Sequence, residues 1–205
     1  LRPLLAWSHF GRRLLSPWQV VLVGNTTAGK SSLLNALLGY QRSLVDGAAG
    51  TTRDVLTAVT AVAGWPVELA DTAGSRAEAG ALESEGISRA TRHVASADLV
   101  LVVSDASTAW TEEDARWVYV APHAPIIVHN KCDLVASVPH DRPTGVATSA
   151  RTAAGLSELL DVVAQRLVPN APPPGTAVPF LEHHRQGLSL ALQALEEGAA
   201  DRARR

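Results

Sequence analysis

A glycine-rich segment near the start of the chain constrains its fold more than any other feature. Residues 24–31 read Gly-Asn-Thr-Thr-Ala-Gly-Lys-Ser and match the pattern G-x-x-x-x-G-K-[ST] at every fixed position. The apolar run 19–23 before it is typical of a buried strand, and residues 31–38 after it predict a helix that Gly39 ends. A strand, a phosphate-binding loop and a helix in this order predict an α/β protein with a parallel sheet.

The rest of the chain continues this alternation of strands and helices. Residues 55–63 and 67–70 flank the turn Gly64-Trp65-Pro66, which predicts an antiparallel hairpin. Three further strands are expected at 98–103, at 125–129 and, from a weaker pattern, at 145–148. We therefore expect an α/β fold of the P-loop NTPase class: a mainly parallel six-stranded sheet with helices on both faces, one antiparallel hairpin strand, and flanking N- and C-terminal helices.

Composition shifts divide the chain into four parts. We expect an N-terminal helical segment at 1–17, a nucleotide-binding domain at 18–170, a proline-rich linker at 171–179, and a C-terminal helix and tail at 180–205. Residues 201–205 are expected to form a frayed, solvated tail. The 205 residues contain no methionine, even at position 1, which predicts that the chain is a piece of a longer protein.

Charge and cysteine content exclude several classes of function. A net charge of -2 provides no overall basic surface for DNA or RNA, so any RNA contact is expected to be indirect. The single Cys132 excludes an internal disulfide and fits a reducing compartment. Because no apolar run reaches the ~20 residues of a membrane span, we expect a cytoplasmic protein that binds no membrane.

The glycine-rich loop predicts how a nucleotide's phosphates would be held. Its backbone N–H groups can surround the phosphates, Lys30 can bridge the β- and γ-phosphates, and the Ser31 hydroxyl can bind Mg²⁺. Lys30 and Lys131 are the only lysines of the chain. Arginine cannot replace a slim ammonium among phosphate oxygens, which indicates a functional reason for Lys30. The candidate residues in this segment are Gly24, Thr27, Ala28, Gly29, Lys30, Ser31 and Ser32.

Two further segments complete the expected phosphate and metal site. Residues 71–74 read Asp-Thr-Ala-Gly and follow the second hairpin strand. Asp71 is expected to hold the Mg²⁺ shell, and the Gly74 N–H to contact the γ-phosphate. Between the two motifs, Thr51 and Thr52 are nucleotide-binding candidates, and the hydroxyl of Thr52 would complete the Mg²⁺ shell. The alternative for this threonine segment is a flexible linker without contacts.

A base site is predicted at the ends of the last strands. Residues 130–133 read Asn-Lys-Cys-Asp and follow the strand 125–129. A carboxylate at Asp133 can accept hydrogen bonds from guanine N1–H and the 2-amino group, which adenine does not offer together. A site built on such bonds can reject the wrong base by ~10⁴-fold, so GTP or GDP is the expected ligand. The candidate base-site residues are Asn130, Lys131, Asp133, Ser149 and Ala150, whose N–H would meet guanine O6.

Longer runs resemble one branch of the GTPase superfamily. They are 29–37 (Gly-Lys-Ser-Ser-Leu-Leu-Asn-Ala-Leu), 50–56 (Gly-Thr-Thr-Arg-Asp-Val-Leu), 71–76 (Asp-Thr-Ala-Gly-Ser-Arg) and 83–90 (Glu-Ser-Glu-Gly-Ile-Ser-Arg-Ala). In this order they resemble the G domain of the bacterial tRNA-modification GTPases, the MnmE (TrmE) family, over residues 18–168. The resemblance implies Mg²⁺-dependent GTP hydrolysis and a role in the modification of the tRNA wobble uridine.

The resemblance also implies a catalytic group and a second cation. Glu83 corresponds to the family's acid/base, which orients the attacking water through a second water, and Lys30 and Gly74 complete the expected catalytic set. The family has an asparagine at position 27, where it coordinates K⁺. Thr27 offers a shorter oxygen ligand, so we expect weaker K⁺ selectivity than in the family. The expected K⁺ ligands are Thr27, Asp46, Ala48 and Thr51.

Partners follow from the same resemblance. It implies a homodimer formed through the G domains and an FAD-dependent tRNA-modifying partner. The family's folate-binding domain and its C-terminal Cys-x-Gly-Lys motif do not occur in these 205 residues. Two alternatives therefore stay open: a GTP/GDP-binding regulatory module that does not hydrolyse GTP, and a ribosome-assembly GTPase of the Era/Der type.

Overall fold

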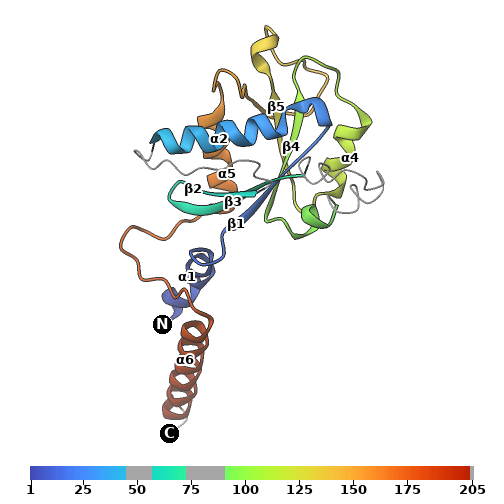
Figure 1. The fold of residues 1–205 in the computed structure, drawn as a ribbon. Coiled ribbons are helices and arrows are strands. Elements are labelled where there is room, and N and C mark those ends of the chain that lie inside the picture. Colours follow the sequence, from blue (N-terminus) through green and yellow to red (C-terminus); the bar gives the residue numbers. More distant parts are fainter. Residues whose placement is uncertain (45–56, 73–90, 204–205) are drawn as a thin grey trace, which may run out of the picture. The chain divides into compact units, whose positions relative to one another are not determined.

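A six-stranded sheet organises the larger part of the chain (Figure 1). The computed structural model describes residues 1–44, 57–72 and 91–203. It divides the chain into two compact units. The unit Trp18–Leu167 contains the sheet, and the other unit consists of Leu1–Pro17 together with Val168–Arg205.

The sheet is mainly parallel, with the strand order β2-β3-β1-β4-β5-β6. The strands are β1 (Trp18–Val23), β2 (Thr57–Val62), β3 (Trp65–Asp71), β4 (Leu99–Asp105), β5 (Ile126–Asn130) and β6 (Val146–Ala147). Every neighbouring pair is parallel except β2 and β3, which form an antiparallel hairpin. This arrangement confirms the predicted sheet and its single antiparallel strand.

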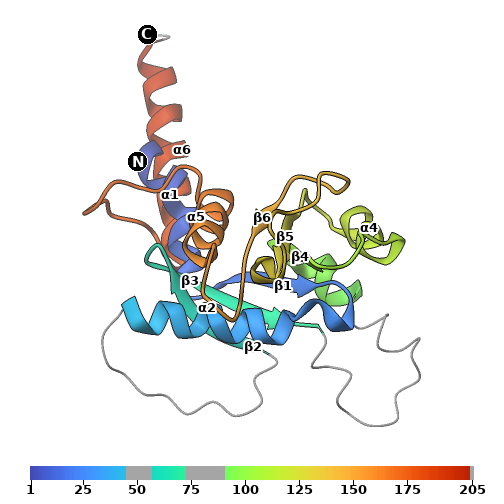
Figure 2. The same cartoon turned by 90° about the horizontal axis from the view of Figure 1, so that it is seen from above.

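Helices cover both faces of the sheet (Figure 2). Helix α2 (Lys30–Leu44) contacts helix α5 (Leu156–Leu167) and strands β1 to β3, whereas helix α4 (Glu112–Val120) contacts β4. Val21 and Val23 share a core with Trp117 of α4. Val20 and Leu22, at 0% exposure, point to the opposite face because successive side chains of a strand alternate. The central strands are thus buried on both faces, as a covered parallel sheet requires.

The end of helix α2 differs from the sequence-based expectation. Gly39 does not end the helix, which continues to Leu44. A glycine inside a helix costs only about 1 kcal/mol. Leu33, Leu34 and Leu37 are almost fully buried on the inner face of α2. Their packing outweighs that local cost, so the predicted helix end was wrong.

The sequence Thr111-Glu112-Glu113-Asp114 predicts a helix start with Thr111 as its cap, and a capping box does begin helix α4. The Thr111 hydroxyl accepts a hydrogen bond from Asp114 N at 3.2 Å, and Asp114 Oδ2 accepts one from Thr111 N at 3.0 Å. These two bonds satisfy donors that the first turn would otherwise leave unpaired. The cap fixes the start of α4 beside the carboxyl end of β4.

The smaller unit consists mainly of two helices. Helix α1 (Arg2–Arg13) contacts helix α6 (Glu182–Ala203), and Arg2 pairs with Glu196 at 2.6 Å. Helix α6 continues to Ala203, so residues 201–203 are helical and not the start of a frayed tail. Within the described ranges, no helix is both long enough and apolar enough to cross a membrane.

Candidate functional site

The predicted motifs meet at the carboxyl edge of the parallel strands. The glycine-rich loop follows β1, Asp71 ends β3, Asn130 ends β5, and Ser149 follows β6. In open α/β sheets this edge is where ligands bind, because the connecting loops separate there. The fold therefore brings together segments that lie more than 100 residues apart, such as Ala28 and Asn130.

Two glycines allow the first loop to approach its neighbours. Gly24 has φ 134°, and a Cβ there would lie 2.0 Å from the carbonyl oxygen of Val103. Gly29 is left-handed with φ 82°, and a Cβ there would lie 2.8 Å from Asn130 Nδ2. Only glycine combines these backbone angles with such close contacts. The loop between them contains the short helix η1 (Thr26–Ala28) and leads into α2.

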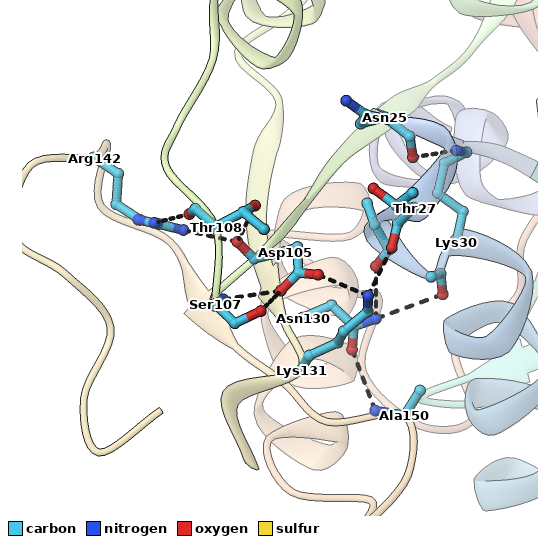
Figure 3. Close-up of polar contacts among 12 residues, drawn as sticks. Asn25, Thr27, Lys30, Asp105, Ser107, Thr108, Asn130, Lys131, Arg142 and Ala150 are labelled. Carbon is cyan, nitrogen blue, oxygen red and sulfur yellow. Dashed lines mark hydrogen bonds and ion pairs between the residues drawn. The ribbon is translucent and has the colours of Figure 1, made fainter. Parts of the chain in front are cut away.

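The ammonium of Lys30 lies against this loop (Figure 3). Lys30 is 3% exposed, and its Nζ donates to Gly24 O at 2.9 Å and to Asn25 O at 2.8 Å. An ammonium held against the backbone of a phosphate-binding loop is suited to phosphate oxygens, since charge-assisted hydrogen bonds are stronger than those to neutral carbonyls. The buried stem of the lysine restricts where that charge can go.

Hydroxyl and carboxylate oxygens meet beside the start of α2. Ser31 Oγ donates a hydrogen bond to Asp71 Oδ2, and Asp71 is 6% exposed. Thr72 binds Leu22 O through its N–H at 3.3 Å and its hydroxyl at 2.9 Å, which fixes the end of β3 against β1. Hydroxyl and carboxylate oxygens are ligands that Mg²⁺ prefers, so this donor set fits the metal.

A hollow of about 330 Å³ lies between the glycine-rich loop and the residues after β5 and β6. Its lining includes Gly29, Ser32, Asn130, Lys131, Asp133 and Ala150. Asn130 is 1% exposed, and its side chain joins the surrounding segments. It donates from Nδ2 to Ala28 O at 2.9 Å and accepts at Oδ1 from Ala150 N at 3.2 Å. The amide thereby fixes the width of the hollow.

Asp133 presents a charged carboxylate to this hollow. Ser149 Oγ donates to its Oδ1 at 2.6 Å, and Arg151 Nε lies 3.1 Å from its Oδ2. The Ser149 hydrogen bond, helped by the positive charge of Arg151, holds the pKa of Asp133 below its ordinary value. Asp133 is therefore ionised at neutral pH and can accept two hydrogen bonds from a guanine edge.

Lys131 connects the base site to the glycine-rich loop. Its Nζ donates to Thr27 O at 2.7 Å and to Asp105 Oδ2 at 2.7 Å (Figure 3). Its backbone is left-handed, with φ 62°, which costs a non-glycine residue roughly 1–2 kcal/mol. The two hydrogen bonds of Nζ help to hold Lys131 in this uncommon backbone conformation.

Sequence reasoning missed Asp105, although its place at the end of a buried strand was a usable signal. Burial alone would raise the pKa of Asp105, but hydrogen bonds from Lys131 and Ser107 outweigh burial and hold that pKa below its ordinary value. Asp105 Oδ1 accepts from Ser107 N at 2.9 Å and from Ser107 Oγ at 2.6 Å. Asp105 is thus an ionised partner for Lys131.

Several predicted site residues lie outside the described residues. They are Asp46, Ala48, Thr51, Thr52, Gly74 and Glu83. Of the expected K⁺ ligands, only Thr27 is described; it is exposed, and its carbonyl oxygen accepts from Lys131. Within the described ranges, histidine, cysteine and carboxylate side chains form no group of three that could hold a metal ion.

The fold and the site together define a class of protein. A mainly parallel sheet with a G-K-S loop after β1 and an N-K-C-D segment after β5 is a P-loop GTP hydrolase. A family model described as 50S ribosome-binding GTPase matches residues 19–131, and the chain belongs to this family. The membership confirms the predicted class of enzyme.

Curated relatives narrow the similarity further. The chain is 40% identical over 201 residues to the tRNA modification GTPase MnmE of Chloroflexus aurantiacus, covering 94% of this chain and 44% of that protein. It is 36% identical over 202 residues to the protein of the same name from Synechococcus sp. (strain JA-3-3Ab), covering 96% of this chain and 44% of the relative. The chain thus spans less than half the length of these relatives.

Solved structures share the fold. The cytosolic domain of the T. maritima FeoB iron transporter in its GMPPNP form superposes with a TM-score of 0.55 at 23% identity, covering 76% of this chain and 65% of that chain. Translation elongation factor SelB from Methanococcus maripaludis, in complex with the GTP analogue GppNHp, gives 0.54 at 17% identity, covering 76% and 34%. At these identities the likeness concerns the fold alone.

Proposed function

We propose that this chain is the GTP-hydrolysing domain of a tRNA-modifying protein and converts GTP to GDP and phosphate. The observation that carries the proposal is that Asp133 lines a hollow bordered by the glycine-rich loop, and that the ammonium of Lys30 is held against this same loop. This ammonium is suited to phosphates, and the ionised carboxylate of Asp133 is suited to a guanine edge. The similarity to tRNA modification GTPases supports the tRNA part of the proposal.

The phosphates would be bound by the glycine-rich loop. Lys30 would exchange the carbonyl oxygens of Gly24 and Asn25 for β- and γ-phosphate oxygens. The backbone N–H groups of the loop, from Thr27 to Ser32, would surround the same oxygens, because the N-terminus of α2 begins there. Thr51 would add a further contact to the nucleotide.

A magnesium ion would be held by Ser31, Asp71 and Thr52. When bound, it would neutralise charge on the β- and γ-phosphates. Ser31 and Asp71 supply the hydroxyl and carboxylate oxygens that already contact each other.

Two further groups would act on the γ-phosphate and the attacking water. Gly74 would donate its N–H to the γ-phosphate. Glu83 would accept the proton of the attacking water through a second water.

A monovalent cation would bind beside the same phosphates, with Thr27, Asp46, Ala48 and Thr51 as its ligands. The hydroxyl of Thr27 is shorter than the asparagine side chain that the MnmE family has at this position. We therefore propose K⁺ activation weaker than in that family. Turnover in KCl and in NaCl at equal ionic strength measures this, and a strong preference for K⁺ would contradict it.

The remaining expectations concern the whole protein. We propose that the GTP-binding domain comprises residues 18–170, with a linker at 171–179 between it and the C-terminal helix. The domain would pair with a second copy of itself and act with an FAD-dependent tRNA-modifying partner in the cytoplasm. The length of the relatives, more than twice that of the match, supports a larger protein around this domain.

Single-turnover hydrolysis tests the catalytic part. Glu83→Gln removes the proposed base, so we expect hydrolysis to slow by about 100-fold or more while GTP affinity stays near that of the wild type. Glu85→Gln removes an equal charge two residues away and serves as the matched control, with a rate within about twofold of the wild type. Tight GTP binding without phosphate release in the unaltered protein would instead identify a regulatory module that does not hydrolyse GTP.

The tRNA part needs a separate measurement. Deletion of the gene that encodes this chain should remove a modified wobble uridine from cellular tRNA, as measured by mass spectrometry of tRNA nucleosides. The full-length gene should restore the modification, and the same gene carrying Glu83→Gln should not. An unchanged set of wobble nucleosides together with accumulated ribosomal precursors would point to ribosome assembly.

A further inference from the structure

A loop segment outside every recognised motif is fixed to the base site. It consists of Arg142 and Pro143, in the loop between the short helix η3 (Cys132–Leu134) and strand β6. The side chain of Arg142 is 2% exposed, which is unusual for an arginine. Burying a guanidinium costs free energy unless its donors are bound, so the contacts of Arg142 indicate what its position achieves.

The guanidinium of Arg142 bridges two carbonyl oxygens of the turn after β4 (Figure 3). Its Nη1 donates to Asp105 O at 3.2 Å, and its Nη2 donates to Thr108 O at 2.6 Å. Among the described residues, its ion pair is with Asp141, whose Oδ1 lies 4.0 Å from Nε. The main contacts of Arg142 are therefore its two hydrogen bonds to the backbone of the turn, and its ion pair is the weaker interaction.

This turn orients the carboxylate that holds the base-site lysine. Ser107 binds Asp105 Oδ1 through its N–H and its hydroxyl, so Oδ1 is fully engaged within the turn. The remaining oxygen, Oδ2, accepts from Lys131 Nζ at 2.7 Å. The direction of Oδ2 depends on the geometry of the turn, and Arg142 bridges the two ends of that turn.

A second buried side chain holds the same loop segment. His129 is 2% exposed, and its Nε2–H donates to Pro143 O at 2.9 Å. Because a carbonyl oxygen can only accept, Nε2 carries the proton, and the other ring nitrogen, Nδ1, accepts from Ser104 Oγ at 3.0 Å. Because His129 directly precedes Asn130, the strand that carries the base motif also positions the residue next to Arg142.

We propose that Arg142 is a positioning residue of the base site, acting through Asp105 on Lys131. Arg142 keeps the turn 105–108 closed, Asp105 then points Oδ2 at the ammonium, and Lys131 stays between Asp105 and Thr27. Loss of Arg142 loosens Lys131 and weakens the binding of every guanine nucleotide. Lys30 and Ser31 keep contacts of their own, so we expect the rate of hydrolysis at saturating GTP to stay unchanged.

Calorimetry with GDP tests this role without requiring hydrolysis or any tRNA activity. We expect Arg142→Ala to raise the Kd for GDP about tenfold, the size expected when a charged hydrogen-bonding group is lost. Arg142→Lys keeps the charge but not the planar fork, so it should recover part of the affinity. In steady-state hydrolysis the KM for GTP should rise while kcat stays unchanged, since only uniform binding is lost.

Arg166→Ala is the matched control. Arg166 Nη1 also donates to a backbone carbonyl, Ala124 O at 2.7 Å, but at the opposite end of β5 from the base site. We expect the Kd for GDP of this variant to stay within about twofold of the wild-type value. A rise equal to that of Arg142→Ala would show that any lost carbonyl contact weakens binding, and would overturn the proposal.

A double-mutant cycle separates positioning from general support of the fold. If Arg142 acts through Asp105, then Asp105→Asn combined with Arg142→Ala should bind GDP no more weakly than Asp105→Asn alone. Additive losses in Kd would overturn the proposal, as would an Arg142→Ala variant with unchanged Kd and only a lower Tm. If Arg142→Ala does not fold, the same cycle with Arg142→Lys tests in the same way whether Arg142 acts through Asp105.

Discussion

The two ends of the proposed nucleotide site, the phosphate end around Lys30 and the base end around Asp133, are built differently. At the phosphate end, Lys30 Nζ contacts loop carbonyls and Ser31 contacts Asp71, so each group would exchange a protein partner for a nucleotide or metal one. At the base end, the carboxylate of Asp133 is held by Ser149, and Lys131 is held by Asp105. Those contacts can persist when a base binds.

This difference assigns separate tasks to the two ends. A pre-formed base site loses little freedom on binding and therefore contributes affinity and specificity. A phosphate site whose groups change partners can respond to whether a γ-phosphate is present. We infer that the base end supplies affinity and choice of nucleotide, and that the phosphate end supplies catalysis.

The largest effect is expected from removing the charge at the phosphate end. Lys30→Ala should slow GTP hydrolysis by about 1,000-fold, because the developing negative charge loses its buried ammonium. The ratio of GTP to ATP affinity should change little, since the base end is intact. Single-turnover rates and competition binding measure the two quantities. A large loss of preference for GTP over ATP would contradict the assignment of separate tasks to the two ends.

The converse change is at the base end. Asp133→Asn should weaken GTP binding by at least about 100-fold, because an amide offers only one acceptor where guanine N1–H and its amino group need two. At saturating GTP the hydrolysis rate should stay near that of the wild type. Steady-state kinetics would show a raised KM, and a fall in kcat as large as the rise in KM would contradict the separation of tasks.

One pH effect is expected from His129, the buried histidine that directly precedes Asn130 of the base site. Burial, together with the charge of Arg142, holds the pKa of His129 below its ordinary value, against the opposing effects of Pro143 O and Asp114. Neutral His129 therefore stabilises the fold fully above about pH 6.5, and this contribution is lost as the pH falls, by at most about 1.4 kcal/mol per pH unit.

Chemical denaturation between pH 5 and pH 7 checks this expectation. The free energy of unfolding should decrease toward pH 5 more steeply in the wild type than in His129→Gln, which keeps an amide donor and acceptor but does not titrate in this range. Parallel curves for the two proteins would show that His129 does not carry the effect.

The smallest effect concerns helix α2, which connects the phosphate loop to the fold. Gly39→Ala should raise the free energy of unfolding by about 0.5–1 kcal/mol, because alanine favours a helix and, among the described residues, nothing outside the local helix backbone lies within 4 Å of the added Cβ. Thermal or urea unfolding measures the gain. In contrast, Gly24→Ala should destabilise the loop, since its Cβ would meet Val103 O at 2.0 Å.

Local patterns were sufficient to predict the sheet and the placement of the motifs. Alternating apolar runs identified the strands, and the Thr111 cap identified the start of α4. Gly39 was misread because its local preference is outweighed by the packing of the leucines before it. The motifs after β1 and β5 could be placed at one edge because parallel strands end together.

The support of the base site could not be predicted in the same way. Arg142 binds carbonyl oxygens that lie 37 and 34 residues earlier in the chain, and no spacing rule links them. Every residue has a backbone carbonyl, so the sequence does not indicate which carbonyls a side chain binds. Such contacts can be identified only in the folded structure. His129 was visible only as one residue of an apolar strand.

Competitive calorimetry with GTP, GDP and ATP in the presence of Mg²⁺ tests the central account most directly. A buried ammonium at Lys30 and an ionised carboxylate at Asp133 should bind GTP and GDP, with ATP weaker by about 10⁴-fold. Equal affinity for GTP and ATP, or binding of neither, would contradict the account.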